Sequence, residues 1–311
     1  MPDKKAVQVP VVVDGRQLRL SNLDKVLYPA TETTKGEVLN YYARVAPFLL
    51  PHLIERPVTR IRWPNGTNGP SFFEKNLPSG APSWLHHVDV PTSGSRSQSG
   101  NGTISYPVVR DTADLTYLVN LASLELHVPQ WRFDPDGEPG TVCNPDRLVI
   151  DLDPGSPAGL HECSLLALLV RDRLEHIGLR CAPVTSGSKG MQLYAALPGE
   201  QGSDTISEVA REIAQDLTKV RPELVVWKMT KSLRPGKVLL DWSQNAAAKT
   251  TITPYSLRGK DAPFVAAPRT WAEVERGADK RDALRQLDLN DVLARIASEG
   301  DVFATTLYGD S

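Results

Sequence analysis

Two aspartates, Asp151 and Asp153, are the residues of this 311-residue sequence whose types and spacing most clearly suggest chemistry. They follow the apolar run Leu148-Val149-Ile150 and precede Pro154-Gly155, a pattern typical of a short buried strand that ends at a breaker. Alternate side chains of a strand point the same way, so the two carboxylates share a face and repel each other. A divalent cation relieves that repulsion, because Mg²⁺ and similar hard cations bind carboxylate oxygens. Two hydrated aspartates in a turn are the simpler alternative.

A third aspartate, Asp241, also follows an apolar run, Val238-Leu239-Leu240. The small-residue loop Ser186-Gly187-Ser188-Lys189-Gly190 lies between predicted strands at 182–185 and 191–194. Backbone N–H groups of such a loop can form an anion-binding nest, and Lys189 adds a positive charge. The loop is not a Walker A motif, since both its spacing and the following helix differ. Three strand-end aspartates around an anion-binding loop therefore favour a metal site over hydrated turns.

The composition fits a globular protein with uneven charge. Hydrophobic residues make up 41% and charged residues 23%, and the length suits two ordinary domains or one large two-lobed domain. The net charge of −2 does not indicate a general polyanion surface. However, residues 228–260 contain seven basic residues and one acid, whereas residues 272–311 contain nine acids and five basic residues. This distribution favours a local anion site.

Several classes of protein are disfavoured. No apolar run approaches the ~20 residues of a membrane helix, and the N-terminal residues lack the apolar stretch of a secretion signal. The cysteines, Cys143, Cys163 and Cys181, are too few and too far apart for a disulfide framework or a zinc knuckle. We therefore expect a cytoplasmic protein without a membrane partner.

Hydrophobic periodicity predicts the elements that position these residues. Helices are predicted from Thr33-Thr34 to near Pro47 or Pro51, over 113–126 with His127 at its end, over 160–179 and 206–220, and in the tail 271–307. Further strands are predicted within 7–13 and over 58–63, the latter with Arg60 and Arg62 on one face. The polar segment 91–102, whose single charge is Arg96, is predicted to join two strands.

Phe72 and Phe73 are adjacent in the sequence, so on a strand they point to opposite faces, and one interpretation places one ring in the core and the other in solvent. An exposed aromatic ring among basic residues suits base stacking, and core packing of both rings is the rival interpretation. Lys25 and Lys35 flank the start of the first predicted helix. By residue type alone, two ordinary surface lysines are the favoured interpretation.

Together these motifs resemble the polymerase domain of bacterial DNA ligase D, which belongs to the archaeo-eukaryotic primase superfamily and acts in non-homologous end joining. The main matches are Asp151-Leu152-Asp153-Pro154-Gly155, residues 185–190 and residues 238–245, with supporting matches at 22–29, 62–66, 72–75, 127–131 and 254–258. The resemblance implies an α/β fold, in which an N-terminal α/β module packs on a mixed-sheet catalytic module related to the RNA-recognition motif. It also implies a cleft between the modules and one two-lobed domain over 1–311, with catalytic motifs at 148–260 and a helical tail at 271–308.

The resemblance further implies residue roles. Asp151, Asp153 and Asp241 resemble carboxylates that bind two divalent ions, Mn²⁺ or Mg²⁺, and so align a primer 3′-hydroxyl with the α-phosphate. The residues that resemble contacts to an NTP or dNTP are His127, Ser186, Lys189, Arg234, Gln244 and Arg258. Those that resemble contacts to DNA at a gap or double-strand break are Asn22, Lys25, Lys35, Phe72 and Phe73. Among these, the lysines would bind a downstream 5′-phosphate and the phenylalanines would stack on the template base.

The implied activity is template-directed nucleotide addition at short gaps or broken ends, with a family preference for ribonucleotides and Mn²⁺. The chain ends shortly after the polymerase region, which predicts a stand-alone polymerase that relies on a separate ATP-dependent DNA ligase. An end-bridging partner of the Ku type is a further expectation of the resemblance.

Two positions depart from the family pattern. The family's second motif usually runs glycine, an apolar residue and histidine, whereas this chain has Gly190-Met191-Gln192. Glutamine can donate a hydrogen bond but cannot carry a positive charge. Relatives often have a basic residue at the position of Ile61. Both changes leave the carboxylates intact, so we expect activity with altered nucleotide affinity, pH dependence or substrate preference.

Two other functions compete with this one. A metal-dependent enzyme on a different nucleotide substrate, such as a D-x-D glycosyltransferase, leaves Asp241 and the basic stretch 228–260 unexplained. A catalytically weak gap-binding protein is compatible with Gln192, but it leaves clustered carboxylates that only destabilise the fold. The substitution Asp153→Ala discriminates: loss of extension with gap binding retained indicates a polymerase, and no change in either indicates a binding protein.

Overall fold

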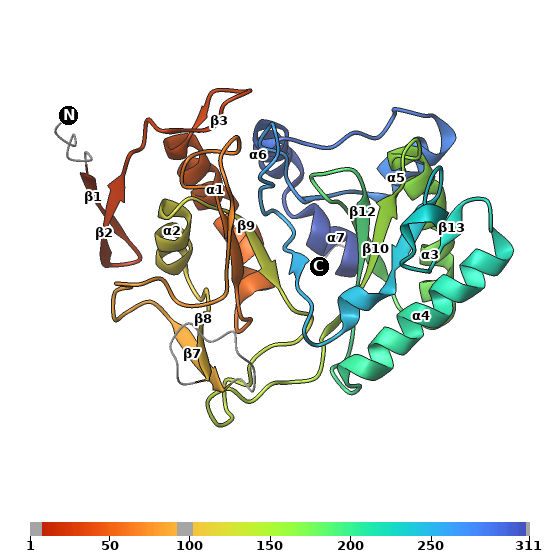
Figure 1. Ribbon diagram of the computed structural model, residues 1–311, viewed down its shortest axis with the longest axis horizontal. Helices are drawn as coiled ribbons and strands as arrows, with labels where there is room; N and C mark the ends of the chain where they lie inside the picture. Colours follow the sequence, from red (N-terminus) through yellow and green to blue (C-terminus); the bar gives the residue numbers. More distant parts are fainter. Residues whose placement is uncertain (1–7, 92–101, 309–311) are drawn as a thin grey trace. The chain divides into compact units, whose positions relative to one another are not determined.

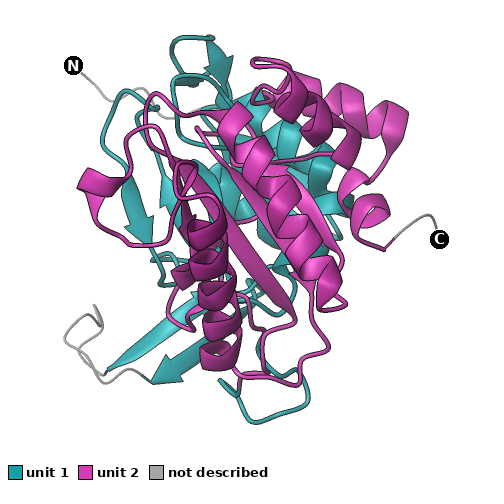
Figure 2. Cartoon of the chain, turned by 90° about the vertical axis from the view of Figure 1, so that its right-hand side faces the viewer, with its two compact units in different colours: residues 1–128, 133–141, 256–264 teal, residues 129–132, 142–255, 265–311 magenta. Residues whose placement is uncertain are grey.

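The computed structural model describes residues 8–91 and 102–308, which divide into two compact units (Figures 1 and 2). The first unit comprises residues 1–128, 133–141 and 256–264, and the second comprises residues 129–132, 142–255 and 265–311. The connection predicted between two strands, with Arg96, falls largely in 92–101, outside the described residues. That residues 1–311 act as a single two-lobed domain stays a prediction.

In its described residues, the first unit contains two helices and short, mostly hairpin-paired strands. Strands β1 and β2 pair with each other, as do β3 and β4, and β7 and β8, while β5 lies between β9 and β6. The elements are β1 (Gln8–Val13), β2 (Arg16–Ser21), β3 (Val26–Tyr28), β4 (Thr33–Thr34), α1 (Lys35–Leu53), β5 (Thr59–Arg62), β6 (Phe72–Glu74), β7 (His87–Pro91), β8 (Thr103–Pro107), α2 (Thr112–Asn120) and β9 (Ser123–Val128).

Helix α1 begins where the sequence predicts and ends later. Thr34 Oγ1 accepts the Glu37 N–H, and the Glu37 carboxylate accepts the Thr34 N–H, so the two residues form a capping box. The helix passes through Pro47 and Pro51 and ends at Leu53, so the predicted end near either proline is wrong. Buried residues continue beyond Pro47, and their packing outweighs the backbone hydrogen bonds that proline removes.

The helix predicted over 113–126 is also wrong in its second half. Helix α2 is capped by the Asp111 side chain and ends at Asn120. Ala122 has a φ of 61°, which an α-helix cannot contain. The chain then forms β9, in which His127 pairs with Thr59 of β5. His127 is therefore a strand residue and not the end of a helix.

The second unit is built on a six-stranded mixed sheet in the order β13-β14-β10-β12-β11-β16. Strands β13 and β14 are parallel and the other neighbours are antiparallel. The strands of this sheet are β10 (Arg147–Pro154), β11 (Cys181–Thr185), β12 (Met191–Ala196), β13 (Val225–Val226), β14 (Val238–Asp241) and β16 (Ala267–Pro268), and the unit also contains β15 (Thr251–Ile252), which lies outside the sheet. The predicted strands at 148–153, 182–185, 191–194 and 238–242 and the predicted mixed sheet are thus confirmed.

Five α-helices accompany this sheet, together with the 3₁₀ segments η1 (Lys231–Leu233) and η2 (Trp242–Asn245). They are α3 (Leu160–His176), α4 (Ser203–Val220), α5 (Trp271–Asp279), α6 (Leu289–Glu299) and α7 (Val302–Tyr308). The helices predicted over 160–179, over 206–220 and in the tail are confirmed with shifted ends. Within the described ranges, no helix has both the length and the apolarity needed to cross a membrane.

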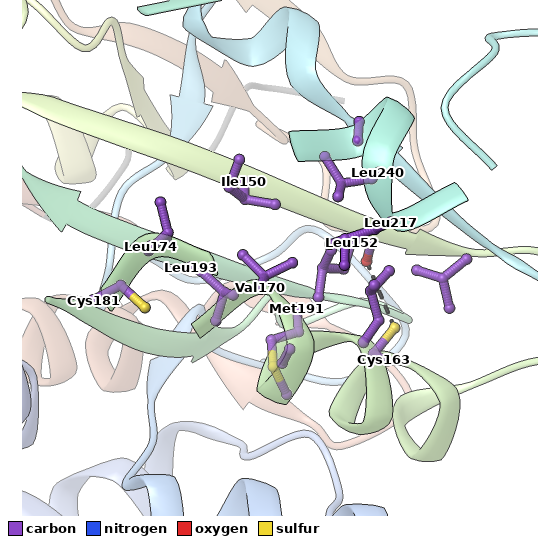
Figure 3. Close-up of a cluster of buried hydrophobic side chains, with 14 of the residues drawn as sticks. Ile150, Leu152, Cys163, Val170, Leu174, Cys181, Met191, Leu193, Leu217 and Leu240 are labelled. Atoms are coloured by element: carbon purple, nitrogen blue, oxygen red, sulfur yellow. Dashed lines mark hydrogen bonds between the residues drawn. The ribbon is translucent and has the colours of Figure 1, made fainter. Parts of the chain in front are cut away.

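One large core cluster of the second unit lies on one face of this sheet (Figure 3). Leu152, Leu193 and Leu240, from three neighbouring strands, join Val170 of α3 and Leu217 of α4 in one buried cluster. Burying each such side chain contributes about 1.5–3 kcal/mol to folding. Successive strand residues point to opposite faces. The residues that alternate with these leucines, including the three motif aspartates, therefore lie on the other face of the sheet.

Candidate active site

The three aspartates are brought together by strand register. Asp151 of β10 lies directly opposite Asp241 of β14, and Asp153 lies two residues further along β10. Opposite residues of an antiparallel pair share a face, as do residues two apart, so all three carboxylates project from one side of the sheet. Each residue is half-buried. Three accessible hard oxygen donors on one face fit a divalent cation such as Mg²⁺ or Mn²⁺.

Asp153 is paired with two basic side chains. Lys189 Nζ lies 2.8 Å from Asp153 Oδ1, and Arg234 Nη1 lies 3.5 Å from Asp153 Oδ2. The Lys189 side chain is 62% exposed, and such pairs contribute only about 0–1 kcal/mol. Both basic groups can therefore exchange the carboxylate for a more strongly charged phosphate at little cost.

Asp241 is bonded by the residues that follow it. Its Oδ1 accepts hydrogen bonds from the Ser243 N–H at 3.0 Å and the Ser243 hydroxyl at 2.6 Å. Its Oδ2 accepts one from Gln244 Nε2 at 3.1 Å. The short segment η2 thus folds back on the end of β14 and fixes the rotamer of this carboxylate. Gln244 therefore lies beside a proposed metal ligand, and its contact with the nucleotide stays a prediction.

The loop 186–190 does not offer an open nest of amides. Ser186 Oγ accepts the N–H groups of Ser188 and Gly190, and the Ser186 N–H donates to the Gly190 carbonyl. The Gly187 N–H donates to Gln286 Oε1 at 2.8 Å, and Gln286 Nε2 donates to the Gly190 carbonyl at 3.1 Å. These backbone groups shape the loop, so the side chain of Lys189 is its main feature for an anion.

Gln192, the departure from the family motif, is in contact with a motif aspartate. It pairs with Asp151 in the register of β10 and β12, and its Nε2 lies 3.0 Å from Asp151 Oδ1. Tyr194 donates its hydroxyl proton toward Gln192 Oε1 at 3.0 Å. A row of three polar side chains, Gln192, Asp151 and Asp241, therefore crosses three adjacent strands.

A second cluster, in the first unit, holds the other two implied nucleotide contacts. His127 Nε2 lies 2.8 Å from Glu125 Oε2, and Arg258 Nη1 lies 3.3 Å from the same oxygen. Glu125 Oε1 also accepts the Gly259 N–H at 3.0 Å. Burial of Glu125 favours its neutral form, but the hydrogen bond with His127 and the charge of Arg258 prevail, and the pKa of Glu125 lies below its usual value. Glu125 therefore orients both residues.

Lys25 and Lys35 lie at the start of α1. The Lys35 N–H donates to the Lys25 carbonyl, and Lys35 Nζ donates to the Ser21 carbonyl at 2.6 Å. Burial, together with the nearby charge of Lys25, lowers the pKa of Lys35 to about 8. Two close ammonium groups are stabilised by an anion. Asn22, in the left-handed region with a φ of 53°, forms the turn that brings Lys25 back.

Phe72 and Phe73 are both exposed, by 48% and 61%, so neither the interpretation with one ring in the core nor the one with both rings there holds. Strand β6 has three residues and lies at the edge of its sheet, where neither face is covered. The two rings line a hollow of about 740 Å³ together with Arg62 and Lys75. Arg60 and Arg62 both contact Glu74, as expected for two residues on one face of β5.

Another cluster meets a simple spacing criterion for metal binding. In the described part of the chain, His86, Asp111 and Asp114 offer donor atoms within 4.8 Å of one another. Asp114 is completely buried and bonded to His86 and to Arg16. These contacts already explain the buried carboxylate as a structural feature. Among the described residues, the motif aspartates do not meet this criterion, and each is bonded to another side chain of the site.

Comparison with known proteins places these features in a family. The family model described as LigD, primase-polymerase domain, matches residues 34–303. The multifunctional non-homologous end joining DNA repair protein LigD of Mycobacterium tuberculosis (strain ATCC 25618 / H37Rv) is 49% identical over 291 residues. The bifunctional non-homologous end joining protein LigD of Bacillus subtilis (strain 168) is 33% identical over 288 residues.

The alignments cover most of this chain but less than half of each of these relatives. The alignments cover 92% of this chain in both cases, but 36% of the mycobacterial protein and 44% of the Bacillus protein. A solved structure, the polymerase domain from Mycobacterium tuberculosis ligase D in complex with DNA, matches with a TM-score of 0.85 and 47% identity. That match covers 94% of this chain and 99% of the solved chain, so the likeness concerns one region of the longer relatives.

Proposed function

The chain belongs to the LigD primase-polymerase family, a family of nucleotidyltransferase domains, and on that premise we propose that it extends a primer strand under the direction of a template. The observation that carries this proposal is the register of β10 and β14, which sets Asp151 opposite Asp241 with Asp153 on the same face. The side chains of Lys189 and Arg234 contact the carboxylate of Asp153. Clustered acids with adjacent, exchangeable basic groups suit metal-assisted phosphoryl transfer.

Asp151, Asp153 and Asp241 would hold two divalent ions, Mn²⁺ or Mg²⁺. Such ions align a 3′-hydroxyl with an α-phosphate and stabilise the leaving pyrophosphate. Lys189 and Arg234 would turn from Asp153 to the triphosphate oxygens, since their pairs with the carboxylate are weak. Gln244 would keep Asp241 in one orientation, and Ser186 would hold the loop that carries Lys189.

His127 and Arg258 are proposed as further contacts to the triphosphate. The observation in favour is their shared partner, the buried Glu125, which holds one histidine and one guanidinium group in fixed positions. A buried carboxylate that orders two basic side chains is a common way to present them to an anion. NTPs and dNTPs are both candidate substrates, and the family tends to prefer ribonucleotides.

The proposed DNA substrate is a short gap or a broken end with a downstream 5′-phosphate. Lys25 and Lys35 are proposed to bind that phosphate, with Asn22 shaping their turn. Phe72 and Phe73 are proposed to stack on a template base, because exposed rings beside a hollow with basic residues suit base stacking. The relatives' part in non-homologous end joining suggests the same pathway here, with Ku and an ATP-dependent DNA ligase as partners.

Primer extension tests this function. A primer is annealed to a template with a short gap before a downstream strand, and Mn²⁺ is supplied with either NTPs or dNTPs. We expect incorporation that follows the template base and is stronger with a downstream 5′-phosphate than with a 5′-hydroxyl. Tight gap binding without incorporation of either nucleotide set would instead indicate a gap-binding protein, and incorporation that ignores the template would exclude a templated polymerase.

A further inference from the structure

Gln192 holds one of the proposed metal ligands by a neutral hydrogen bond. It lies opposite Asp151 in the register of β12 and β10, on the face of the sheet away from α3 and α4. Its Nε2 lies 3.0 Å from Asp151 Oδ1, and only 6% of the residue is exposed. A buried amide in this place has little freedom to turn away, so the hydrogen bond is a fixed part of the site.

Asp151 determines which end of the Gln192 amide faces it, and Tyr194 contacts the other end. A carboxylate only accepts, and a reversed amide would set its oxygen against it, so the NH₂ group is the end directed at Asp151. The Tyr194 hydroxyl lies 3.0 Å from Gln192 Oε1 and 2.8 Å from the Ile252 carbonyl, and these two acceptors share its single proton.

The tyrosine ring is itself held in place. Phe303 of α7 packs against it edge to face, with ring centroids 5.7 Å apart. The Arg147 guanidinium carbon lies 5.7 Å from the centre of the same ring. Tyr194 is almost completely buried. Packing from two directions therefore fixes the position of the Tyr194 hydroxyl. The fixed hydroxyl in turn restrains the Gln192 side chain.

From this chain of contacts we infer that Tyr194 and Gln192 act as positioning residues for Asp151, by orienting its carboxylate toward a divalent cation without adding charge. This inference rests on the proposed function. A positively charged partner, such as Lys189 beside Asp153, offsets the charge of its carboxylate and competes with a cation. The neutral amide leaves the charge of Asp151 undiminished. Outer partners of this kind commonly change metal affinity by about 10–100-fold when removed.

The test measures Mn²⁺ binding by electron paramagnetic resonance, without DNA or nucleotide, so that it does not depend on catalysis. Gln192→Leu removes the donor at similar size, and Tyr194→Phe removes only the hydroxyl. Gln192→His restores an N–H donor. The control, Gln201→Leu, makes the same exchange at an exposed position. Thermal unfolding confirms that each variant is folded.

We expect Gln192→Leu to weaken Mn²⁺ binding by roughly tenfold and Tyr194→Phe by a smaller factor in the same direction. Gln192→His should recover most of the loss, and Gln201→Leu should match the parent protein. In primer extension, added Mn²⁺ should restore the kcat of Gln192→Leu, with the nucleotide KM at saturating Mn²⁺ unchanged.

Unchanged Mn²⁺ affinity in a folded Gln192→Leu variant would overturn the inference, as would a Gln192→His variant that binds Mn²⁺ as weakly as Gln192→Leu. Unchanged affinity in Tyr194→Phe would remove the tyrosine from it. A parent protein whose Mn²⁺ binding depends on Gln192 but which extends no primer would contradict the proposed function and leave the positioning role supported. A parent protein that binds no Mn²⁺ would contradict both.

Discussion

Among single residues, Glu125 shows how one buried carboxylate can prepare two ligand contacts. It forms a hydrogen bond with His127, accepts one from the backbone N–H of Gly259, and forms an ion pair with Arg258. Removal of its charge would leave both basic side chains less constrained, because charge-assisted hydrogen bonds are about twice as strong as neutral ones. The role of Glu125 is indirect, since it would act through residues that touch the nucleotide.

We therefore predict that Glu125→Gln lowers kcat/KM for the incoming nucleotide by roughly tenfold, the equivalent of one charge-assisted contact. Single-nucleotide extension under steady-state conditions measures this effect. Glu200→Gln, at an exposed position, serves as the matched control. Equal kcat/KM values in the two variants would show that His127 and Arg258 do not need Glu125.

Lys35 gives a prediction with a definite direction in pH. Burial and the charge of Lys25 lower its pKa to about 8, so in the free protein it loses its proton as pH rises from about 7 to 9. A bound phosphate raises that pKa, because an anion stabilises the ammonium form. Phosphate binding is therefore favoured at the lower pH and weakens as the pH rises.

The expected result concerns the advantage of a 5′-phosphate over a 5′-hydroxyl in gap binding. This advantage should stay level up to about pH 7 and fall roughly threefold to tenfold by about pH 9, since a terminal phosphate is already doubly ionised there. Fluorescence anisotropy with the two gapped duplexes measures it. Lys35→Arg keeps its charge over this range, so a decline of equal size in that variant would assign the effect to another group.

For individual residues, the sequence was informative where chemistry depends on close neighbours in the chain. Asp151 and Asp153 are two apart on a strand, which fixes their common face whatever surrounds them. No sequence pattern indicated a role for Gln286, because it contacts the 186–190 loop across about a hundred residues of sequence. The sequence signal for Glu125 was weak: this residue lies two positions before His127 within β9, on the same face of the strand.

At the level of elements, Gly190 shows how closely the 186–190 loop approaches β10. A Cβ atom built on Gly190 would lie 2.1 Å from the Leu152 carbonyl oxygen, which is shorter than any tolerable contact. Leu152 lies between Asp151 and Asp153, so relief of the clash requires a shift either of the loop or of the strand that carries them.

We predict that Gly190→Ala lowers the free energy of unfolding by about 2 kcal/mol or more, as overpacking against a backbone usually does. Chemical denaturation measures this change. Gly202→Ala is the matched control, because a Cβ there meets only one atom, at 3.9 Å, and should cost less than about 1 kcal/mol. Equal stability of the two variants would mean that the loop can retreat from β10 freely.

Element types were predictable and element ends were not. The stripe of α1 and its Thr34 capping box are local features, whereas its passage through Pro47 and Pro51 depends on what the later turns pack against. The pattern 113–126 fits a helix throughout, but pairing with β5 makes its second half a strand. Periodicity records which residues are buried and does not record which distant strand buries them.

For the whole molecule, the net charge of −2 does not show that the proposed catalytic and DNA-binding residues belong to different units. The carboxylates and Lys189 belong to the second unit, whereas Lys25, Lys35 and the phenylalanine pair belong to the first. The chain returns to the first unit at residues 256–264, which no sequence pattern indicated. Chemistry and DNA binding are thus assigned to different residues and should be separable by mutation.

The measurement that tests this account most directly is primer extension and gap binding by Asp153→Ala beside the parent protein. We predict that extension falls by roughly a thousandfold or more, because the variant loses a metal ligand, while affinity for the gapped duplex with its 5′-phosphate stays within about twofold. Asp89→Ala, at an exposed strand position, should change neither. Extension that survives in Asp153→Ala would contradict the assignment of the carboxylates and with it the proposed polymerase mechanism.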